Sequence, residues 1–338
     1  MSVLMVTRSD DGSATARVMR ALDALGEQPV RFDTDLYPQE VSLSTRLERG
    51  RVHRVLTTPQ GRFELGEVTA VWYRRFLAGG RLPESLGDMR EPSVAEARRT
   101  VYGTIAALGV FELDPLVCVR KADHKELQLA RAHAHGLHTA RTLFTNEPAA
   151  ARAFWEELEG RVITKMQSSF ALHREGREAV VFTNRVRRED LEALEGLRAC
   201  PMTFQELLPK ACELRVTVVG RRVFAASVDS QQSARTELDW RRDGVGLLEA
   251  WKPYSLPSEV EQGLLAVVAD FGLNYAAADI IVTPEGRHVF LEINAGGEWA
   301  WLDESPGLPI AQALAEVLAG RAQRGPSLLR HPLDAPGR

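Results

Sequence analysis

The chain has 338 residues, of which 44% are hydrophobic and 26% charged, and its 42 basic and 46 acidic residues give a formal net charge of −4. These are the values of an ordinary globular protein, and they exclude a disordered, collagen-like or coiled-coil chain. A charge so near neutral also disfavours a general nucleic-acid binder, which needs a basic surface. Only five of the basic residues are lysines, so each lysine is an informative position.

The first third of the chain alternates between apolar patterns typical of strands and of helices. In chain order these patterns predict a strand at 3–7, a helix at 13–25, a strand at 29–32, a meander of strands within 40–76 that ends with a strand at 70–73, and a helix at 92–109. A strand, a helix and a strand at this spacing indicate an α/β unit with parallel strands. We expect an N-terminal α/β domain over residues 1–115.

The rest of the chain is richer in strands. The patterns predict helices at 123–135 (capped by Asp123), 147–158, 257–271 and 308–320, strands at 141–144, 161–165, 179–182 and 202–207, and hairpins at 213–228 and 279–294. We expect a central subdomain over 116–195, a C-terminal subdomain over 196–323 and a mobile, proline-containing tail over 324–338.

The N-terminus and the cysteines bear on the cellular setting. The first residues carry no signal-peptide pattern, and no apolar run reaches the roughly 20 residues that a membrane-spanning helix needs. Three cysteines without a CxxC pair disfavour a disulfide framework and a structural zinc site. We therefore expect a cytoplasmic protein with neither a membrane nor a nucleic acid as its partner.

The hairpin over residues 279–294 is the strongest candidate for a functional site. Residues two apart on a strand share a face, so Glu292 and Asn294 point the same way. A turn at 284–287 places Asp279 opposite Glu292. Three oxygen-bearing side chains then converge, and hard oxygen ligands suit Mg²⁺ held together with substrate phosphates.

A surface hairpin with polar residues facing water is the competing interpretation. The intervening Leu291 and Ile293 are expected to point into the core on the opposite face. The apolar run at 275–278 and the glycine pair at 296–297 favour a functional site, because glycines let the backbone approach a bulky anion.

Two lysines are candidates for binding phosphate. Lys125 lies on the predicted helix 123–135 and Lys165 ends a predicted strand. A lysine is a compact point charge that suits phosphate oxygens, whereas an arginine is a planar fork. Either residue is open to the simpler interpretation of a solvated surface lysine, and Lys121 is close enough to Lys125 to compete for its role.

Three shorter polar patterns are compatible with a nucleotide site. They are Gln205-Glu206 followed by Leu207 and Leu208 at a strand end, Glu213 and Arg215 on one face of a hairpin strand, and residues 239–242 with Arg241. Each pattern also has a simpler interpretation. The first could be only a strand terminus, the second a surface ion pair of little energetic value, and the third a polar loop.

In combination these motifs resemble the ATP-grasp superfamily, and within it the microviridin-type ribosomal peptide maturases, also called graspetide synthetases. The stretch from Val71 to Arg75 is similar to that family's pre-ATP-grasp signature. The later matching stretches, in the family's order, are Lys125 with 127–130, 140–146, 205–206, 213–215, 239–241 and 290–294. Two features depart from the family pattern: Ala295 replaces the usual proline, and the loop at 166–177 contains a single glycine.

The resemblance implies an α/β (α+β) ATP-grasp fold with an N-terminal α/β pre-ATP-grasp domain, and a role for each matching residue. Lys125 and Lys165 would hold the ATP phosphates, and Asp279, Glu292 and Asn294 would hold Mg²⁺. The rest of the nucleotide would be bound by Gln205, Glu206, Leu207, Leu208 and Glu213. Arg215 and Arg241 would face the γ-phosphate and the acyl phosphate, and one of Arg74, Arg75 and Arg215 would clamp the substrate carboxylate.

The implied activity is that of an ATP-dependent, ADP-forming carboxylate ligase. It would activate Asp or Glu side chains of a ribosomal precursor peptide as acyl phosphates and join them to Ser or Thr as esters, or to Lys as amides, to form macrocycles. We expect a homodimer that recognises the leader of the peptide through a surface groove in the central region, near the arginine-rich stretch at 185–190. The competing interpretation of that stretch is a solvated run of charges. The alternatives are an amino-acid or peptide ligase of the ribosomal-protein glutamate ligase type, and a non-catalytic nucleotide- or peptide-binding protein.

Overall fold

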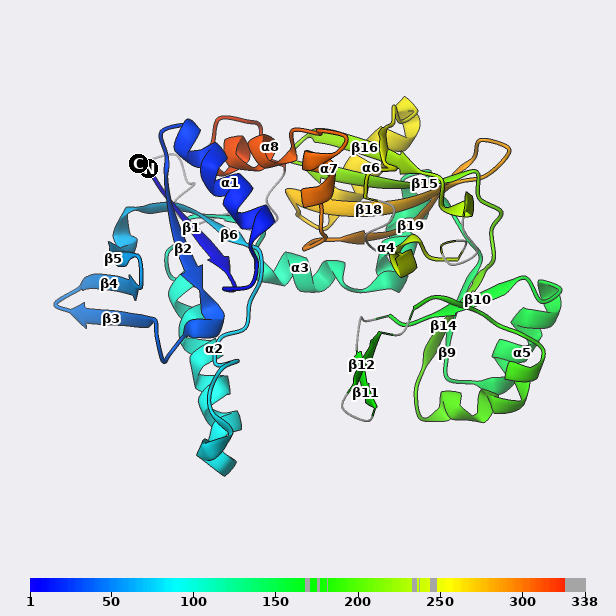
Figure 1. The fold of residues 1–338 in the computed structure, drawn as a ribbon, viewed down its shortest axis with the longest axis horizontal. Coiled ribbons are helices and arrows are strands. Elements are labelled where there is room, and N and C mark those ends of the chain that lie inside the picture. The colour runs from blue at the N-terminus through cyan, green and yellow to red at the C-terminus, as the bar shows by residue number, and fades with distance from the viewer. Residues whose placement is uncertain are drawn as a thin grey trace.

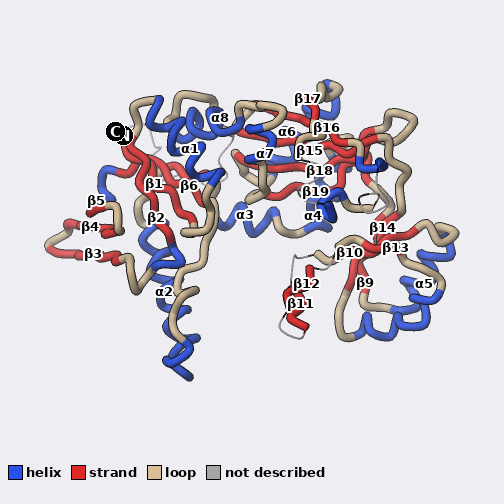
Figure 2. The backbone as a smooth tube through the Cα atoms, in the orientation of Figure 1, coloured by secondary structure: helices blue, strands red, loops and turns tan. Residues whose placement is uncertain are grey.

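The computed structural model describes residues 1–167, 171–174, 177–180, 182–232, 236, 238–243 and 248–325. It is built from helices packed on several separate sheets, which confirms the mixed α and β class (Figure 1). In the same orientation, Figure 2 separates the strands of these sheets from the helices around them. The expected tail at 324–338 lies almost wholly outside the described residues.

A four-stranded parallel sheet, here called the N-terminal sheet, has the strand order β2-β1-β6-β7. Its strands are β1 (Ser2–Thr7), β2 (Gln28–Asp33), β6 (Val68–Tyr73) and β7 (Phe111–Leu113). Val3 and Met5 of β1 belong to one buried cluster, and Leu4 and Val6 belong to another. Both faces of β1 are therefore covered, as is usual for a parallel strand.

Helices cover the two faces of the N-terminal sheet. Their bounds are Ser13–Ala24 for α1, Arg90–Ala106 for α2 and Ile310–Leu318 for α8. Residues of α1 and α8 share one buried cluster with the sheet, and residues of α2 share the other. Because α8 comes from the end of the described chain, it joins the N-terminal sheet to the C-terminal part of the molecule (Figure 1).

The predicted meander differs from the structure at its last strand. The antiparallel meander consists of β3 (Ser42–Glu48), β4 (Arg51–Thr58) and β5 (Gly61–Glu64). The strand expected at 70–73 is β6, and it pairs in parallel with β1 instead. A run of apolar residues indicates a buried strand, but it does not identify the strand's partner.

A six-stranded sheet has the order β17-β16-β15-β18-β19-β8. Its strands are β8 (His138–Thr139), β15 (Cys212–Val219), β16 (Arg222–Val228), β17 (Lys252–Pro253), β18 (Tyr275–Val282) and β19 (His288–Asn294). The predicted hairpins correspond to β15–β16 and β18–β19. Helices α3 (Leu116–Ala122), α4 (Lys125–Ala134) and α6 (Ser258–Asp270) pack on this sheet through a common cluster.

Asp123 does not cap α4 as predicted. The helix begins at Lys125 after His124, and Asp123 instead follows the last residue of α3. Helix α3, which was not predicted, ends just before Asp123, so Asp123 lies at the carboxyl end of one helix rather than at the start of the next.

A four-stranded antiparallel sheet, here called the central sheet, has the order β13-β10-β14-β9. Its strands are β9 (Thr142–Thr145), β10 (Val162–Lys165), β13 (Asn184–Arg185) and β14 (Met202–Glu206). Helix α5 (Pro148–Glu157) and the 3-10 segment η4 (Glu189–Arg198) pack against it. Two further strands, β11 (Ala171–Arg174) and β12 (Arg177–Val180), pair with each other.

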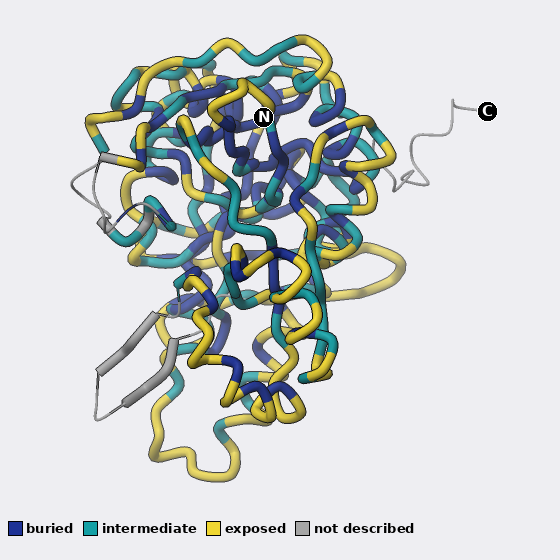
Figure 3. Tube along the Cα trace, turned by 90° about the vertical axis from the view of Figure 1, so that its right-hand side faces the viewer, coloured by how far each residue is buried: buried dark blue, intermediate teal, exposed yellow. Residues whose placement is uncertain are grey.

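The remaining short elements are η1 (Thr34–Leu36), η2 (Leu65–Glu67), η3 (Glu84–Met89), η5 (Ser230–Gln232), η6 (Trp240–Asp243) and α7 (Ala300–Glu304). Figure 3 shows the buried residues concentrated inside the larger part of the molecule, with exposed residues along the loops. Across the described ranges, no helix is both long and apolar enough to cross a membrane.

Candidate active site

A cleft of about 520 Å³ lies between the central sheet and the six-stranded sheet. The structure brings these predicted site residues to its lining: Lys125, Lys165, Gln205, Glu206, Leu207, Leu208, Glu213, Asp279, Glu292 and Asn294. The volume falls in the range typical of pockets for small molecules and cofactors. Side chains from two separate sheets thus face one ligand-sized space.

The β18–β19 hairpin places its carboxylates as predicted. Asp279 pairs with Glu292 as expected, but from Ile280 to the turn the pairing is shifted by one residue, so that Ile280 pairs with Phe290. A bulge next to Asp279 absorbs that difference by leaving Leu291 without a partner strand residue. Ile293 is buried as expected, but Leu291 lines the cleft. The expectation that Leu291 points into the core was wrong because a bulge breaks the strict alternation.

Lys125, Glu292 and Asn294 form a compact charged group. The Lys125 ammonium lies 3.0 Å from a Glu292 carboxylate oxygen and donates to the Asn294 side-chain oxygen at 3.3 Å. The Asn294 amide donates to the other Glu292 oxygen at 3.1 Å. Burial would raise the pKa of Glu292, but the charges of Lys125 and Lys165 outweigh it and lower the pKa to about 2. Glu292 is therefore an anion at neutral pH.

Arg215 holds the second carboxylate. One of its terminal nitrogens donates to both Asp279 oxygens, at 2.9 and 3.1 Å, and the other donates to the main-chain oxygen of Glu298 at 2.9 Å. Burial lowers the pKa of Arg215, but the charge of Asp279 outweighs this effect and the pKa is raised. Arg215 is thus a permanent cation beside Asp279.

The donor chemistry of Asp279, Glu292 and Asn294 fits Mg²⁺. Two carboxylates and one amide supply only hard oxygen atoms, and Mg²⁺ commonly combines one or two carboxylates with water and substrate phosphates. Among the described residues, no group of three or more His, Cys, Asp and Glu side chains gathers as a metal site. A set of two carboxylates and one amide suits a cation whose remaining ligands are nucleotide oxygens and water.

The central sheet supplies the opposite wall of the cleft. Lys165 donates to the Gln205 side-chain oxygen at 3.2 Å, and the Gln205 amide donates to the Thr142 hydroxyl at 2.8 Å. At the end of β14, the main-chain nitrogens of Glu206 and Leu207 bind the oxygens of neighbouring segments at 2.9 Å each. These contacts fix a Lys, Gln and Glu row along one side of the cleft.

Glu213 and Arg215 are not a surface ion pair. Both are buried, and each has its own partner: Glu213 lies 3.0 Å from the Lys210 ammonium, while Arg215 binds Asp279. Burial raises the pKa of Glu213, and the charge of Lys210 opposes that rise. Lys210 also donates to the main-chain oxygen of Leu238 at 3.1 Å, which ties β15 to the segment around the cleft.

The two remaining predicted residues lie differently. Arg74 follows β6 and is not part of the cleft lining; it donates to the main-chain oxygen of Gly296 at 3.0 Å and pairs with Glu298. Arg241 lies in η6 beside the cleft-lining Trp240, but its side chain falls outside the described residues.

Of the other residues weighed for a role, Lys121 donates to the main-chain oxygen of Asp270 at 3.4 Å, away from the cleft lining. The arginine-rich stretch at 185–190 pairs its own charges, with 3.8 Å between Arg187 and Glu189.

Sequence reasoning missed Gln128. Its side chain is fully buried and binds the main chain of Ile293 twice, accepting from the nitrogen and donating to the oxygen at 2.9 Å each. Since Ile293 lies between Glu292 and Asn294, Gln128 anchors the strand that carries both. Gln128 lies within the stretch 127–130 that resembles the family, and this resemblance was the one signal that pointed to it, although it assigned the residue no role.

Lys165 of the central sheet, Lys125 of α4 and the carboxylates of the six-stranded sheet meet at a nucleotide-sized cleft, and this arrangement defines the class of an ATP-grasp protein. Residues 2–120 match a family described as the MvdD pre-ATP grasp domain. A search of the curated proteins found no match to the chain.

Solved structures extend the comparison to the whole chain. The macrocyclase MdnC from Microcystis aeruginosa MRC, bound with the precursor peptide MdnA, is 44% identical with a TM-score of 0.87, over 95% of this chain and 100% of that one. A Chryseobacterium gregarium RiPP-associated ATP-grasp ligase, in complex with ADP and a leader and core peptide, is 36% identical with a TM-score of 0.90, over 97% and 99%. The macrocyclase MdnB from Microcystis aeruginosa MRC is 36% identical with a TM-score of 0.76, over 94% and 98%.

Identity of this size across nearly the full length of both chains shows common membership. The chain belongs to the family of RiPP-associated ATP-grasp ligases that includes these macrocyclases.

Proposed function

We propose that this protein is an ADP-forming ligase that macrocyclises a ribosomal precursor peptide. In this proposal an Asp or Glu side chain of the peptide is activated with ATP and then joined to Ser or Thr as an ester, or to Lys as an amide. The observation that carries the proposal is the meeting of Lys125 and Lys165 with Asp279, Glu292 and Asn294 in one cleft. Identity to two macrocyclases over nearly the whole chain supports the peptide substrate.

Each site residue has a proposed role that follows from its position. Lys125 and Lys165 hold the ATP phosphates, because their ammonium groups face the cleft beside the carboxylates. Gln205, Glu206, Leu207, Leu208 and Glu213 line the part of the cleft assigned to the adenine and ribose. Asp279, Glu292 and Asn294 would hold Mg²⁺, which when bound neutralises negative charge on the nucleotide phosphates.

The chain's arginines stabilise the charge that develops during phosphoryl transfer. A carboxylate is a poor electrophile, and transfer of the γ-phosphoryl group of ATP turns its oxygen into a good leaving group. Arg215 is buried, cationic and bound to the cleft-lining Asp279, although it does not itself line the cleft; we assign it to the charge that develops on the phosphoryl and acyl oxygens. We assign the same kind of role to Arg241, and assign Arg74 to the substrate carboxylate.

The test is incubation of the purified protein with ATP, Mg²⁺ and a panel of acidic peptides that contain Asp or Glu with Ser, Thr or Lys, followed by mass spectrometry and an ADP assay. Cyclisation removes one water per bond and forms one ADP. Addition of a residue mass would favour the alternative of an amino-acid ligase, and absence of ADP with all acidic peptides tried would refute the ligase. Asp279→Ala or Glu292→Ala with full activity would refute the metal assignment.

Three further features are part of the proposal. We propose a homodimer, which light scattering of the purified protein tests directly. We propose a cytoplasmic location, supported by three cysteines that are all unpaired. We also propose domain boundaries at residues 115, 195 and 323, which limited proteolysis would test. Because β14 pairs with β10 on the other side of residue 195, the two fragments produced by cleavage near 195 are expected to stay associated.

A further inference from the structure

The loop at 295–299 carries a carboxylate to which no role is assigned above. The loop follows Asn294 of β19 and returns to the N-terminal sheet, where Glu298 forms ion pairs with both Arg74 and Arg75. These two arginines directly follow β6, at the edge where the parallel strands of that sheet end. In open sheets of this kind, ligands commonly bind at that edge.

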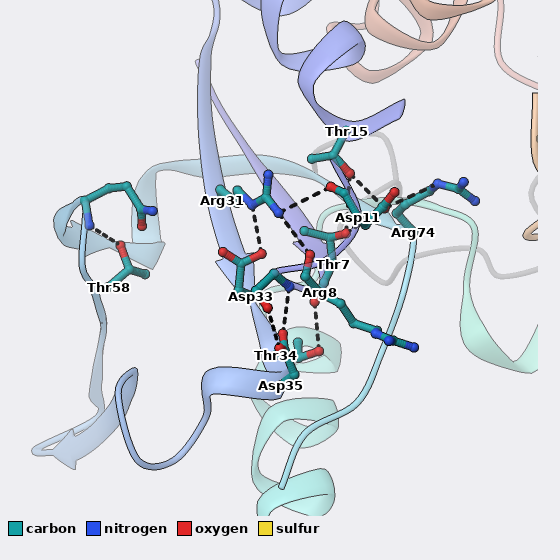
Figure 4. A network of polar contacts seen from close by, with 12 residues as sticks. Thr7, Arg8, Asp11, Thr15, Arg31, Asp33, Thr34, Asp35, Thr58 and Arg74 are labelled. Atoms are coloured by element: carbon teal, nitrogen blue, oxygen red, sulfur yellow. Dashed lines mark hydrogen bonds and ion pairs between the residues drawn. The ribbon is translucent and has the colours of Figure 1, made fainter. Parts of the chain in front are cut away.

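Arg74 is a buried cation that needs a negative partner. Its side chain is only 2% exposed, and its Nε lies 3.5 Å from an Asp11 carboxylate oxygen. Figure 4 shows Arg74 and Asp11 pointing toward each other. The neighbouring Arg75 is 41% exposed. The pKa of Arg75 is lowered, first by burial and then by the charge of Arg74, so the pair favours an added anion. Two guanidinium groups side by side suit a carboxylate group.

The main chain of Glu298 is held in place, whereas its side chain is accessible. Arg215 donates to the Glu298 main-chain oxygen at 2.9 Å, and the Tyr275 hydroxyl donates to the Gly297 oxygen at 2.6 Å. A Cβ at Gly297 would lie 2.5 Å from the Cβ of Ala277, so the loop lies tightly on β18. The Glu298 side chain is 46% exposed. Rotation of that side chain alone would release the arginines without moving the loop.

The arginine pair is connected to the proposed reaction centre through one residue. Arg215 donates to the main-chain oxygen of Glu298 with one terminal nitrogen and to Asp279 with the other. The loop that carries Glu298 is therefore fixed to the residue that holds the proposed metal ligand Asp279.

We propose that Arg74 and Arg75 form a binding site for an acidic side chain of the peptide, and that Glu298 occupies this site until the peptide displaces it. The proposal rests on the function proposed above for its peptide substrate. Exchange of one carboxylate for another conserves the local charge, so entry of an acid needs no new counter-ion. A neutral amide in the same place leaves the buried Arg74 short of negative charge, and the site selects acids over amides.

A simple tether between the two parts of the molecule is the competing role for Glu298, and the chain offers a matched control. Glu304 on α7 pairs with Arg17 on α1 at 2.8 Å, and its side chain is 72% exposed. This pair also joins the C-terminal part to a helix on the N-terminal sheet. Glu304→Gln removes a comparable ion pair away from the proposed site.

The experiment measures fluorescence polarisation of a labelled short peptide of Glu and Ser, and of its Gln and Ser counterpart, without ATP or Mg²⁺. Glu298→Gln is expected to tighten binding of the Glu peptide about five-fold, the scale of one partly exposed ion pair, and to leave the Gln peptide unchanged. Glu304→Gln is expected to change neither affinity, and Arg75→Gln is expected to abolish the preference for Glu over Gln.

Unchanged or weaker binding of the Glu peptide by Glu298→Gln overturns the proposal, as does an equal change for both peptides. Equal effects of Glu298→Gln and Glu304→Gln assign Glu298 to tethering and also overturn it. Because this readout needs no turnover, it is separate from the proposed function, whose failure appears as absence of ADP formation by the wild-type protein.

Discussion

Replacing Glu292 by Gln isolates the charge at the centre of the cleft. The substitution keeps the shape of the side chain and removes only its negative charge. In the folded protein that charge lies 3.0 Å from Lys125, with Asn294 donating to it at 3.1 Å. Without it, Lys125 and Lys165 face each other's charge with one counter-ion fewer. We expect the variant to be less stable than the wild type when no ligand is present.

The size and pH dependence of this loss follow from the pKa of Glu292, which is about 2 in the folded protein against an ordinary value of 4.5. A carboxyl group whose pKa is lowered by folding stabilises the folded protein at pH values above its pKa in the unfolded chain. This stabilisation is lost as the pH falls toward the pKa of the group in the folded protein. At about 1.4 kcal/mol per pKa unit, the contribution is about 3 kcal/mol at pH 7. It decreases to about 1 kcal/mol near pH 3, where the unfolded carboxyl is protonated.

Urea denaturation of both proteins between pH 7 and pH 3, without nucleotide or Mg²⁺, measures this difference. The gap in unfolding free energy is expected to narrow from about 3 to about 1 kcal/mol across that range. Glu96→Gln is the control, because the Glu96 side chain is 71% exposed and pairs with Arg99 on the surface of α2. Such a pair contributes little, so the control is expected to match the wild type.

Equal stability of Glu292→Gln and the wild type at pH 7 would refute the reasoning, since the carboxylate would then contribute nothing to the fold. A loss that stays constant from pH 7 to pH 3 would also refute it, because packing rather than charge would then be responsible.

Lys165→Ala is expected to raise the KM for ATP about tenfold in a coupled ADP assay, because a positive charge that lines the cleft and holds phosphate is lost. The control Lys252→Ala removes an exposed lysine and should leave the KM unchanged, and equal KM values for the two variants would contradict the phosphate role. Gln128→Leu is expected to lower the unfolding free energy by about 2 kcal/mol in urea, because two main-chain groups of β19 lose their buried partner, and an unchanged midpoint would count against it. Gly297→Ala is expected to reduce kcat about tenfold while the circular dichroism spectrum stays unchanged. The added methyl group would lie 2.5 Å from the Ala277 Cβ and displace the loop. Unaltered turnover would show that the position of the loop is unimportant.

Much of the candidate site was predictable because its residues lie on short, regular segments. The predicted turn correctly placed Asp279 opposite Glu292, since hairpin pairing depends on nearby residues. Strand alternation was wrong for Leu291, because a bulge is set by how the whole hairpin packs and twists. The pairing of Arg215 with Asp279 was also not predicted, although both residues were, because β15 and β18 are far apart in the chain.

By itself, the sequence determined the strand and helix periodicities, the mixed α and β class and the residue types available for chemistry, because these depend on composition and local spacing. Only the tertiary structure decided that β6 pairs with β1, that Gln128 anchors Ile293 and that Glu298 reaches Arg74. Each of these contacts joins segments distant in the chain. Their formation depends on the packing of several sheets at once, which no local pattern of residues records.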